Sequence, residues 1–403
     1  MPALKYYYLI IRIDTLTETI DVPKRRIESL DILRGAAIIG VITVHILLGA
    51  GRNVDSTSNG FNIAELAYAG LPMFIIISGY LHKCGKSYKW NIMNRVVPLM
   101  VVLVVATIAF TSLMYGYMYL LGYDLSQYDL LSDIWTVLIG KGVFTTISSD
   151  TFSAGHILSP YDISAGFYYL QILAAGYLIF YAIADPLLKD WRKTVAAIAG
   201  LVCFTALYLA TIDIQLPFSA QLGPIVAAFL LTGALLKNYN VAIYLETGFH
   251  EFRYWAIFIT AVILGAVMII MFPTGMKMYN SYFGAYGPWS VFTFYLFAIF
   301  CGTVLWYIAV FLIKVPIVSD VFKFAGISSL VFYTLHMFIA KLITAPFVTI
   351  GTEFWITVNA DNQRFLVLML TLIILSLLTI ALNRVKGTLK EENIDTDSVP
   401  SSH

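Results

Sequence analysis

The chain has 403 residues, of which 59% are hydrophobic and 12% are charged, and its mean hydropathy is +0.81. A soluble domain carries roughly 25% charged residues, so this composition excludes an ordinary soluble enzyme and predicts a polytopic membrane protein. The net charge of +1 gives no support for a nucleic-acid partner. Cys84, Cys203 and Cys301 follow neither disulfide nor metal-ligand spacing, so we expect free thiols and no metal site.

The first 28 residues contain a short apolar patch that is soon interrupted by charges. They lack the sustained apolar region and the small-residue cleavage site of a signal peptide. We therefore expect residues 1–28 to form a cytoplasmic lead-in that ends in the basic cluster Lys24-Arg25-Arg26.

About ten segments then approach the roughly 20 apolar residues needed to cross a bilayer. Their cores are 30–50, 64–83, 96–121, 166–186, 194–212, 221–238, 255–272, 289–313, 326–347 and 364–383. The apolar stretch 134–146 is shorter and contains Lys141, which favours a re-entrant or interfacial helix. The predicted fold is an all-α polytopic membrane protein, with a transmembrane domain over 29–387 and a disordered cytoplasmic tail over 388–403.

The distribution of Lys and Arg predicts the orientation of these segments, because basic residues concentrate on the cytoplasmic side. If the N-terminus is cytoplasmic, the basic residues of the 83–95 loop and most later ones fall on inner loops. The outer loops then hold only Arg52, Lys141, Lys277 and Arg364. The sequence therefore predicts that both termini lie inside.

The first predicted span carries Arg34 and His45, eleven positions apart. At 1.5 Å per residue they are separated by about 16 Å, which is about half of the hydrocarbon core. Arg34 is thus expected near the cytoplasmic face and His45 at or beyond mid-depth. Ionisable groups are costly in hydrocarbon and usually mark a functional site. The alternatives are an arginine that extends to the interface and a histidine that only packs.

The second span ends in Ser78-Gly79-Tyr80, and a basic loop with Lys83, Lys86, Lys89 and Arg95 follows. If the first two spans pair as a hairpin, Arg34 and this loop form a cationic mouth suited to a polyphosphate ligand. A basic cytoplasmic loop is nevertheless common in membrane proteins. The Ser-Gly-Tyr sequence also fits a close contact between helices through small residues.

Taken together, these patterns resemble the acyltransferase-3 superfamily, whose members are membrane acyltransferases of surface saccharides and related polymers. Arg34 and His45, with ten residues between them, are similar to its Arg–His signature. The stretches that resemble further family motifs are residues 29–37, 72–81, 95–98, 167–171 and 326–336. The resemblance covers roughly residues 29–383. The chain departs from it at Ile92, where many members carry the first arginine of an Arg-x-x-Arg pair, so Lys89 substitutes in part or the donor binds differently.

The resemblance implies a cytoplasmic acyl-CoA donor, most often acetyl-CoA, no tightly bound cofactor, and a hydroxyl acceptor on an extracytoplasmic saccharide or glycolipid. It implies His45 as the catalytic residue and a donor site formed by Arg34, Arg95, Lys83, Lys86 and Lys89. Burial disfavours imidazolium, so we expect a neutral His45. The neutral ring acts as a general base or forms an acyl-histidine intermediate.

Four further residues are candidates for supporting roles. Glu65 is placed to orient His45 or the acceptor, or it is simply solvated at the interface. Ser78 and Tyr80 belong to the second-span motif. His336 either makes a structural hydrogen bond or acts near the donor tail.

Two other functions remain open from the sequence: an exporter of a small envelope precursor without covalent chemistry, and a non-catalytic relative that kept the scaffold. An exporter is expected to contain paired repeats with broken helices, and we identify no such repeat. Retention of both Arg34 and His45 argues against the non-catalytic relative. In each case we expect an integral protein of the cell (cytoplasmic) membrane.

Overall fold

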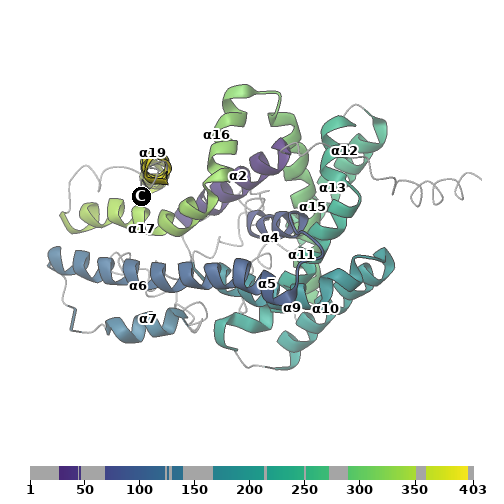
Figure 1. The fold of residues 1–403 in the computed structure, drawn as a ribbon, viewed down its shortest axis with the longest axis horizontal. Coiled ribbons are helices and arrows are strands. Elements are labelled where there is room, and N and C mark those ends of the chain that lie inside the picture. Colours follow the sequence, from purple (N-terminus) through teal and green to yellow (C-terminus); the bar gives the residue numbers. More distant parts are fainter. Residues whose placement is uncertain are drawn as a thin grey trace, which may run out of the picture.

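The structure is a computed structural model, and it describes residues 27–43, 45–46, 69–122, 125–126, 129–138, 167–212, 216–248, 251–271, 289–350 and 360–397. Every regular element in these ranges is helical (Figure 1). The elements are α2 (Glu28–Thr43), α4 (Gly70–Tyr80), α5 (Tyr88–Asn91), η3 (Ile92–Val96), α6 (Val97–Leu120), α7 (Leu130–Leu138), α9 (Tyr168–Leu187), α10 (Trp191–Thr211), η7 (Pro217–Leu222), α11 (Gly223–Asn238), α12 (Val241–Thr247), α13 (Phe252–Met271), α15 (Trp289–Leu312), α16 (Pro316–Ile327), α17 (Ser329–Ile350) and α19 (Ala360–Asp397).

Seven helices in the described ranges are long and apolar enough to cross a membrane, so the chain is an integral membrane protein. They are Tyr88–Leu120, Tyr169–Leu187, Trp191–Thr211, Pro217–Asn238, Phe252–Met271, Trp289–Leu312 and Phe365–Arg384. α16 and α17 qualify as an eighth span only as a pair, bent by 83°. The first two of the ten predicted spans correspond to α2 and α4, which have 16 and 11 residues in the described part. The count of ten therefore stays a prediction.

The centre of the bundle is α11, which packs against α4, α9 and α10. Its residues Ile225 to Leu231 are completely buried. Glycines permit the close approach of α4 and α11: a Cβ on Gly79 would lie 2.0 Å from the Leu230 carbonyl oxygen, and one on Gly233 would lie 1.8 Å from that of Ile76. The small-residue helix contact considered for Ser78-Gly79-Tyr80 is therefore present.

A second glycine crossing fixes α2 against α16. A Cβ on Gly35 would lie 1.9 Å from the Phe322 carbonyl oxygen, and one on Gly326 would lie 2.0 Å from that of Asp31. The apolar pattern leaves residues 314–325 between two predicted spans, the second of which begins at residue 326. The chain instead forms α16, turns at Ser328 and continues as α17, because the backbone contact with α2 holds residues 316–327 as a separate helix.

Two other elements bear on the sequence-based predictions. α7 has nine residues and is too short to cross a bilayer. It is attached to α9 by a hydrogen bond in which Gln171 Nε2 donates to the Val137 carbonyl oxygen at 2.6 Å. α19 continues to Asp397, so residues 388–397 are helical where the sequence predicted a disordered tail.

Candidate active site

His45 and His336 meet in the structure, although they are 291 positions apart in the sequence. His45 lies just beyond α2 and His336 lies on α17. The distance between His45 Nδ1 and His336 Nε2 is 3.4 Å, and the ring centroids are 5.2 Å apart. His336 is completely buried, whereas His45 retains partial exposure. His45 is thus the more exposed member of the pair.

Backbone carbonyl groups determine the tautomer of each ring, because a carbonyl oxygen can only accept a hydrogen bond. His336 Nδ1 donates to the carbonyl oxygens of Tyr333 at 2.7 Å and Phe332 at 3.2 Å, so its Nε2 carries a lone pair. His45 Nδ1 donates to the Val41 carbonyl oxygen at 2.9 Å. The His45 Nδ1–H therefore faces two acceptors, Val41 O and His336 Nε2. His45 Nε2 is left as the basic atom.

Aromatic rings extend from the histidine pair across α17, α9 and α4. The ring centroids of Tyr333 and His336 are 6.0 Å apart, and those of Tyr169 and Tyr333 are 5.4 Å apart. Phe74 on α4 follows at 6.4 Å from Tyr169. Three helices thus contribute one continuous wall beside the histidines.

The two arginines that were predicted to bind the donor both interact electrostatically with the hydroxyl of one tyrosine. The hydroxyl of Tyr177 hydrogen-bonds the side chain of Ser78, and Arg34 and Arg95 both interact electrostatically with Tyr177. Arg34 also acts on Tyr169. Ser78 Oγ donates to the Phe74 carbonyl oxygen at 2.8 Å. Arg34, Arg95 and Ser78 are therefore gathered around α9, as the hairpin hypothesis expects.

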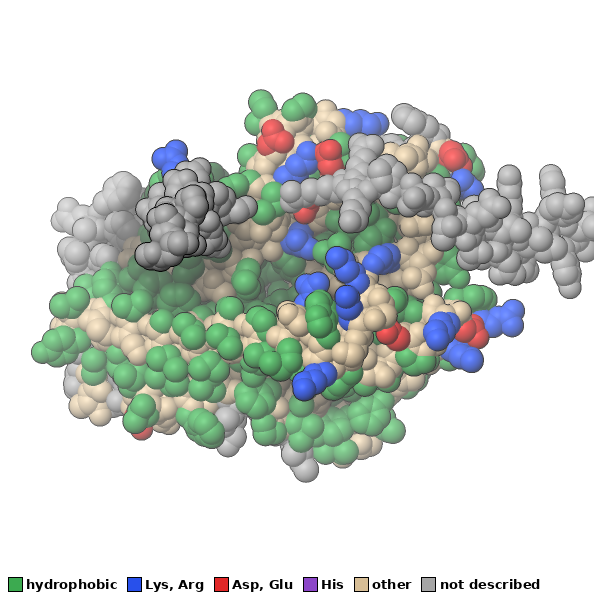
Figure 2. Space-filling model, viewed as in Figure 1, with side chains coloured by type: hydrophobic (Ala, Val, Ile, Leu, Met, Phe, Trp, Pro, Cys, Tyr) green, Lys and Arg blue, Asp and Glu red, His purple; other side chains and the backbone are tan. Residues whose placement is uncertain are grey.

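The basic loop provides additional positive charge at this end of the bundle. Lys83, Lys86 and Lys89 are exposed, and Lys86 Nζ lies 5.3 Å from the centroid of the Trp90 ring. Figure 2 shows Lys and Arg side chains gathered in the middle of the face, over α4 and α5, while hydrophobic side chains cover α6. Such a gathering of cations suits a ligand with several phosphates.

Arg95 lies in the π-helical turn η3, directly before α6. Pro98 follows it and has no backbone N–H, so the regular i→i−4 ladder is interrupted at this point. The Val97 N–H instead donates to the Ile92 carbonyl oxygen, five residues back. Single π turns of this kind occur frequently at functional sites.

A family model described as an acyltransferase domain matches residues 27–383. The chain belongs to the acyltransferase-3 family. It is therefore an enzyme that transfers acyl groups other than amino-acyl groups, and it does so as a membrane protein. A comparison with curated proteins found no match.

The described contacts of this acyltransferase do not place Tyr80 beside the histidines. The Tyr80 ring packs edge-on against Trp306 on α15 at 5.9 Å between centroids, and its hydroxyl interacts with the backbone of Ala242 on α12. These contacts hold α4 against α12 and α15. Glu65 lies outside the described residues.

Three residues of this region, Tyr169, Tyr177 and Lys341, are not among the sequence-predicted site residues. Tyr169, Tyr177 and Tyr181 recur at multiples of four positions, which places them on one face of α9, and this stripe was the available signal. Lys341 is buried in α17, five residues after His336. A charged residue inside an apolar segment was a signal of the same kind as Arg34.

Proposed function

We propose that this acyltransferase moves an acyl group, with acetyl the simplest case, from cytoplasmic acyl-CoA to a hydroxyl of an extracytoplasmic saccharide or glycolipid in the cell membrane. The observation that carries the proposal is the geometry of His45. Its Nδ1–H is held by Val41 O and His336 Nε2, which leaves the basic lone pair on Nε2.

The positive charges support the donor half of the proposal. Arg34, Arg95 and the loop lysines surround one end of the bundle, where they can pair with the phosphates of acyl-CoA. The aromatic wall of Tyr169, Tyr333 and Phe74 leads from this end to His336. The acyl thioester would extend along this wall toward His45.

The histidine pair supports the chemical step. His45 Nε2 removes the proton from the acceptor hydroxyl while the oxygen attacks the thioester carbonyl carbon. The carbon–sulfur bond then breaks, and the CoA thiolate leaves and takes the proton from His45 Nε2, which returns the ring to its neutral form. During proton transfer His45 becomes positively charged, and its Nδ1–H bonds to Val41 O and His336 Nε2 become stronger. An acyl-histidine route would use the same Nε2 lone pair.

The experiment uses membranes that contain the full-length protein and radiolabelled acetyl-CoA, with extraction of envelope glycans and glycolipids. The wild type is expected to label an acceptor, and His45→Ala is expected to reduce labelling by about 10²–10⁴-fold. Equal labelling by both proteins would contradict the catalytic role of His45. If neither protein labels an acceptor from acetyl-CoA or from longer acyl-CoA donors, the proposed donor class is wrong.

The exporter alternative is not favoured, because family membership assigns acyl-transfer chemistry to the chain. An exporter also has no need for a histidine whose Nδ1–H is hydrogen-bonded so that Nε2 can act as a base. The same labelling experiment separates the two functions, since an exporter would move a precursor without attaching label to it.

A further inference from the structure

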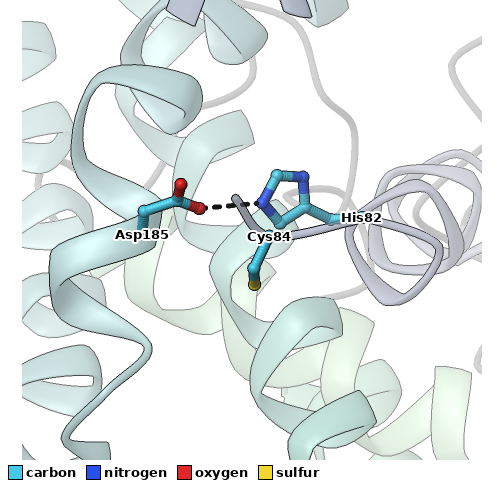
Figure 3. A group of neighbouring side chains, drawn as sticks. All are labelled: His82, Cys84 and Asp185. Atoms are coloured by element: carbon cyan, nitrogen blue, oxygen red, sulfur yellow. Dashed lines mark hydrogen bonds and ion pairs between the residues drawn. The ribbon is translucent and has the colours of Figure 1, made fainter. Parts of the chain in front are cut away.

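His82, Cys84 and Asp185 form a cluster that the proposed acyl transfer does not use (Figure 3). His82 and Cys84 lie in the loop after α4, and Asp185 lies on α9. One ligand-type atom from each residue lies within 4.8 Å of the other two. His82 is buried, Asp185 is half-buried and Cys84 is exposed. The nitrogen of His82 and the oxygen of Asp185 therefore face each other, and the Cys84 sulfur lies to one side of them, within 4.8 Å (Figure 3).

The loop is folded onto Asp185 by two contacts. His82 Nε2 lies 3.4 Å from Asp185 Oδ1, and the Gly85 N–H donates to Asp185 Oδ2 at 3.2 Å. Gly85 has a φ of +82°, which glycine adopts without strain, and this turn brings Cys84 to the cluster. The His82 ring also packs edge-on against Phe180 at 4.9 Å. The imidazole and the carboxylate are thus positioned by contacts on both sides.

This arrangement matches the requirements of a tetrahedral metal ion. Bonds of about 2.0–2.3 Å from zinc to N, O and S place neighbouring ligand atoms about 3.3–3.7 Å apart. The His82–Asp185 separation of 3.4 Å already has this value. Cys84 Sγ has to move by at most about 1.5 Å, and its exposed position beside a glycine turn permits the movement. A thiolate together with an imidazole selects zinc over magnesium or calcium.

We propose that His82, Cys84 and Asp185 bind a zinc ion that clamps the loop after α4 to α9. The loop so held carries Lys83, Lys86 and Lys89, so the ion would fix the position of the cationic mouth. Among the residues that the structure describes, three candidate ligands lie together, so a fourth coordination position is left for water or an exogenous ligand. Sequence spacing does not predict this site, since Asp185 is 103 positions from His82.

The charge around the cluster is compatible with a dication. Lys237 Nζ donates to the His82 carbonyl oxygen, and Lys237 and Arg95 both act electrostatically on His82. A zinc ion bound to one thiolate and one carboxylate has no net charge. The neighbouring cations therefore do not oppose the loaded site.

The test is metal titration of the purified full-length protein after treatment with a chelator under reducing conditions. We expect one Co²⁺ per chain, with a sulfur-to-cobalt charge-transfer band that Zn²⁺ abolishes on displacement. Cys84→Ser is expected to lose the band and to bind Zn²⁺ more than about 100-fold more weakly, because loss of an outer partner alone typically weakens metal binding by 10–100-fold. Asp185→Asn is expected to weaken binding as well.

The matched control is Cys203→Ser, which changes an exposed cysteine on α10 and should leave both the band and the affinity unchanged. Cys84→Ser should elute and melt like the metal-free wild type, because Cys84 is exposed. The proposal is overturned if the wild type does not bind Co²⁺ or Zn²⁺ saturably. It is also overturned if Cys84→Ser binds zinc as tightly as the wild type.

Discussion

His45 Nδ1 lies between two acceptors, and only one of them, the Val41 carbonyl group, belongs to its own helical segment. The other is His336 Nε2, a neutral nitrogen held in place by the Tyr333 and Phe332 carbonyl groups. His336 is therefore a positioning residue in the proposed reaction. A buried neutral acceptor orients the base without adding a charge to the membrane interior.

The role of His336 predicts a graded effect of substitution. His336→Leu removes the acceptor and should lower kcat by about 2–10-fold with little change in KM for acyl-CoA, since one hydrogen bond of about 0.5–1.5 kcal/mol is lost. His336→Gln keeps an acceptor oxygen near the position of Nε2 and should retain more activity than His336→Leu. Steady-state kinetics on the purified variants measure both effects. Equal kcat for the two variants would contradict the acceptor role.

Substitution of Arg95 is expected to weaken donor binding instead. Arg95→Ala should raise KM for acyl-CoA by about 10–100-fold at low salt, because a hydrogen bond to a charged group is worth about 1.5–3 kcal/mol. Added salt should raise the wild-type KM more than that of the variant. Ile92→Arg adds a cation three residues before Arg95 and should lower KM. An unchanged KM in Arg95→Ala would remove this residue from the donor site.

At the scale of elements, two glycine crossings hold the helices that carry the site. Gly79 and Gly233 bring α4 against α11, and Gly35 and Gly326 bring α2 against α16. The first crossing positions Ser78, and the second positions Arg34. The family-like motifs around Gly35, Gly79 and Gly326 therefore encode backbone contact as well as chemistry.

The close contact at Gly79 predicts that alanine is destabilising there but not at an open position such as Gly200. Gly79→Ala places a Cβ 2.0 Å from the Leu230 carbonyl oxygen, so the helices must separate at a cost of about 1–3 kcal/mol. Gly200→Ala on α10 meets open space and should be neutral or stabilising by about 0.5–1 kcal/mol. Thermal unfolding in detergent compares the two variants. A Gly79→Ala protein as stable as Gly200→Ala would show that the helices do not approach so closely.

At the scale of the whole molecule, composition and apolar runs were sufficient to predict an all-helical membrane protein, and eight of the predicted segments correspond to spans or to a bent pair. The sequence could also place Arg34 near Arg95 through the hairpin hypothesis. It could not predict that His336 faces His45, because that contact depends on how α17 packs against α2. The separate helix α16 was missed for the same reason.

The orientation of the molecule is tested through Cys84. If both termini are cytoplasmic, a membrane-impermeant maleimide should label Cys84 in inside-out vesicles and not in right-side-out vesicles. The labelling is done with a chelator present, in a variant with Cys203→Ser and Cys301→Ser. The opposite pattern would invert the predicted topology and place the cationic mouth outside.

Acyl transfer across the membrane through His45 is tested most directly in proteoliposomes. Acyl-CoA is supplied on the side of the loop that carries Lys83 and Lys86, and a hydroxyl acceptor such as a glycolipid extract is supplied on the other side. We expect the wild type to acylate the acceptor across the bilayer, and His45→Ala to show a rate lower by about 10²–10⁴-fold with intact acyl-CoA binding. Acylation at the wild-type rate by His45→Ala would contradict the mechanism.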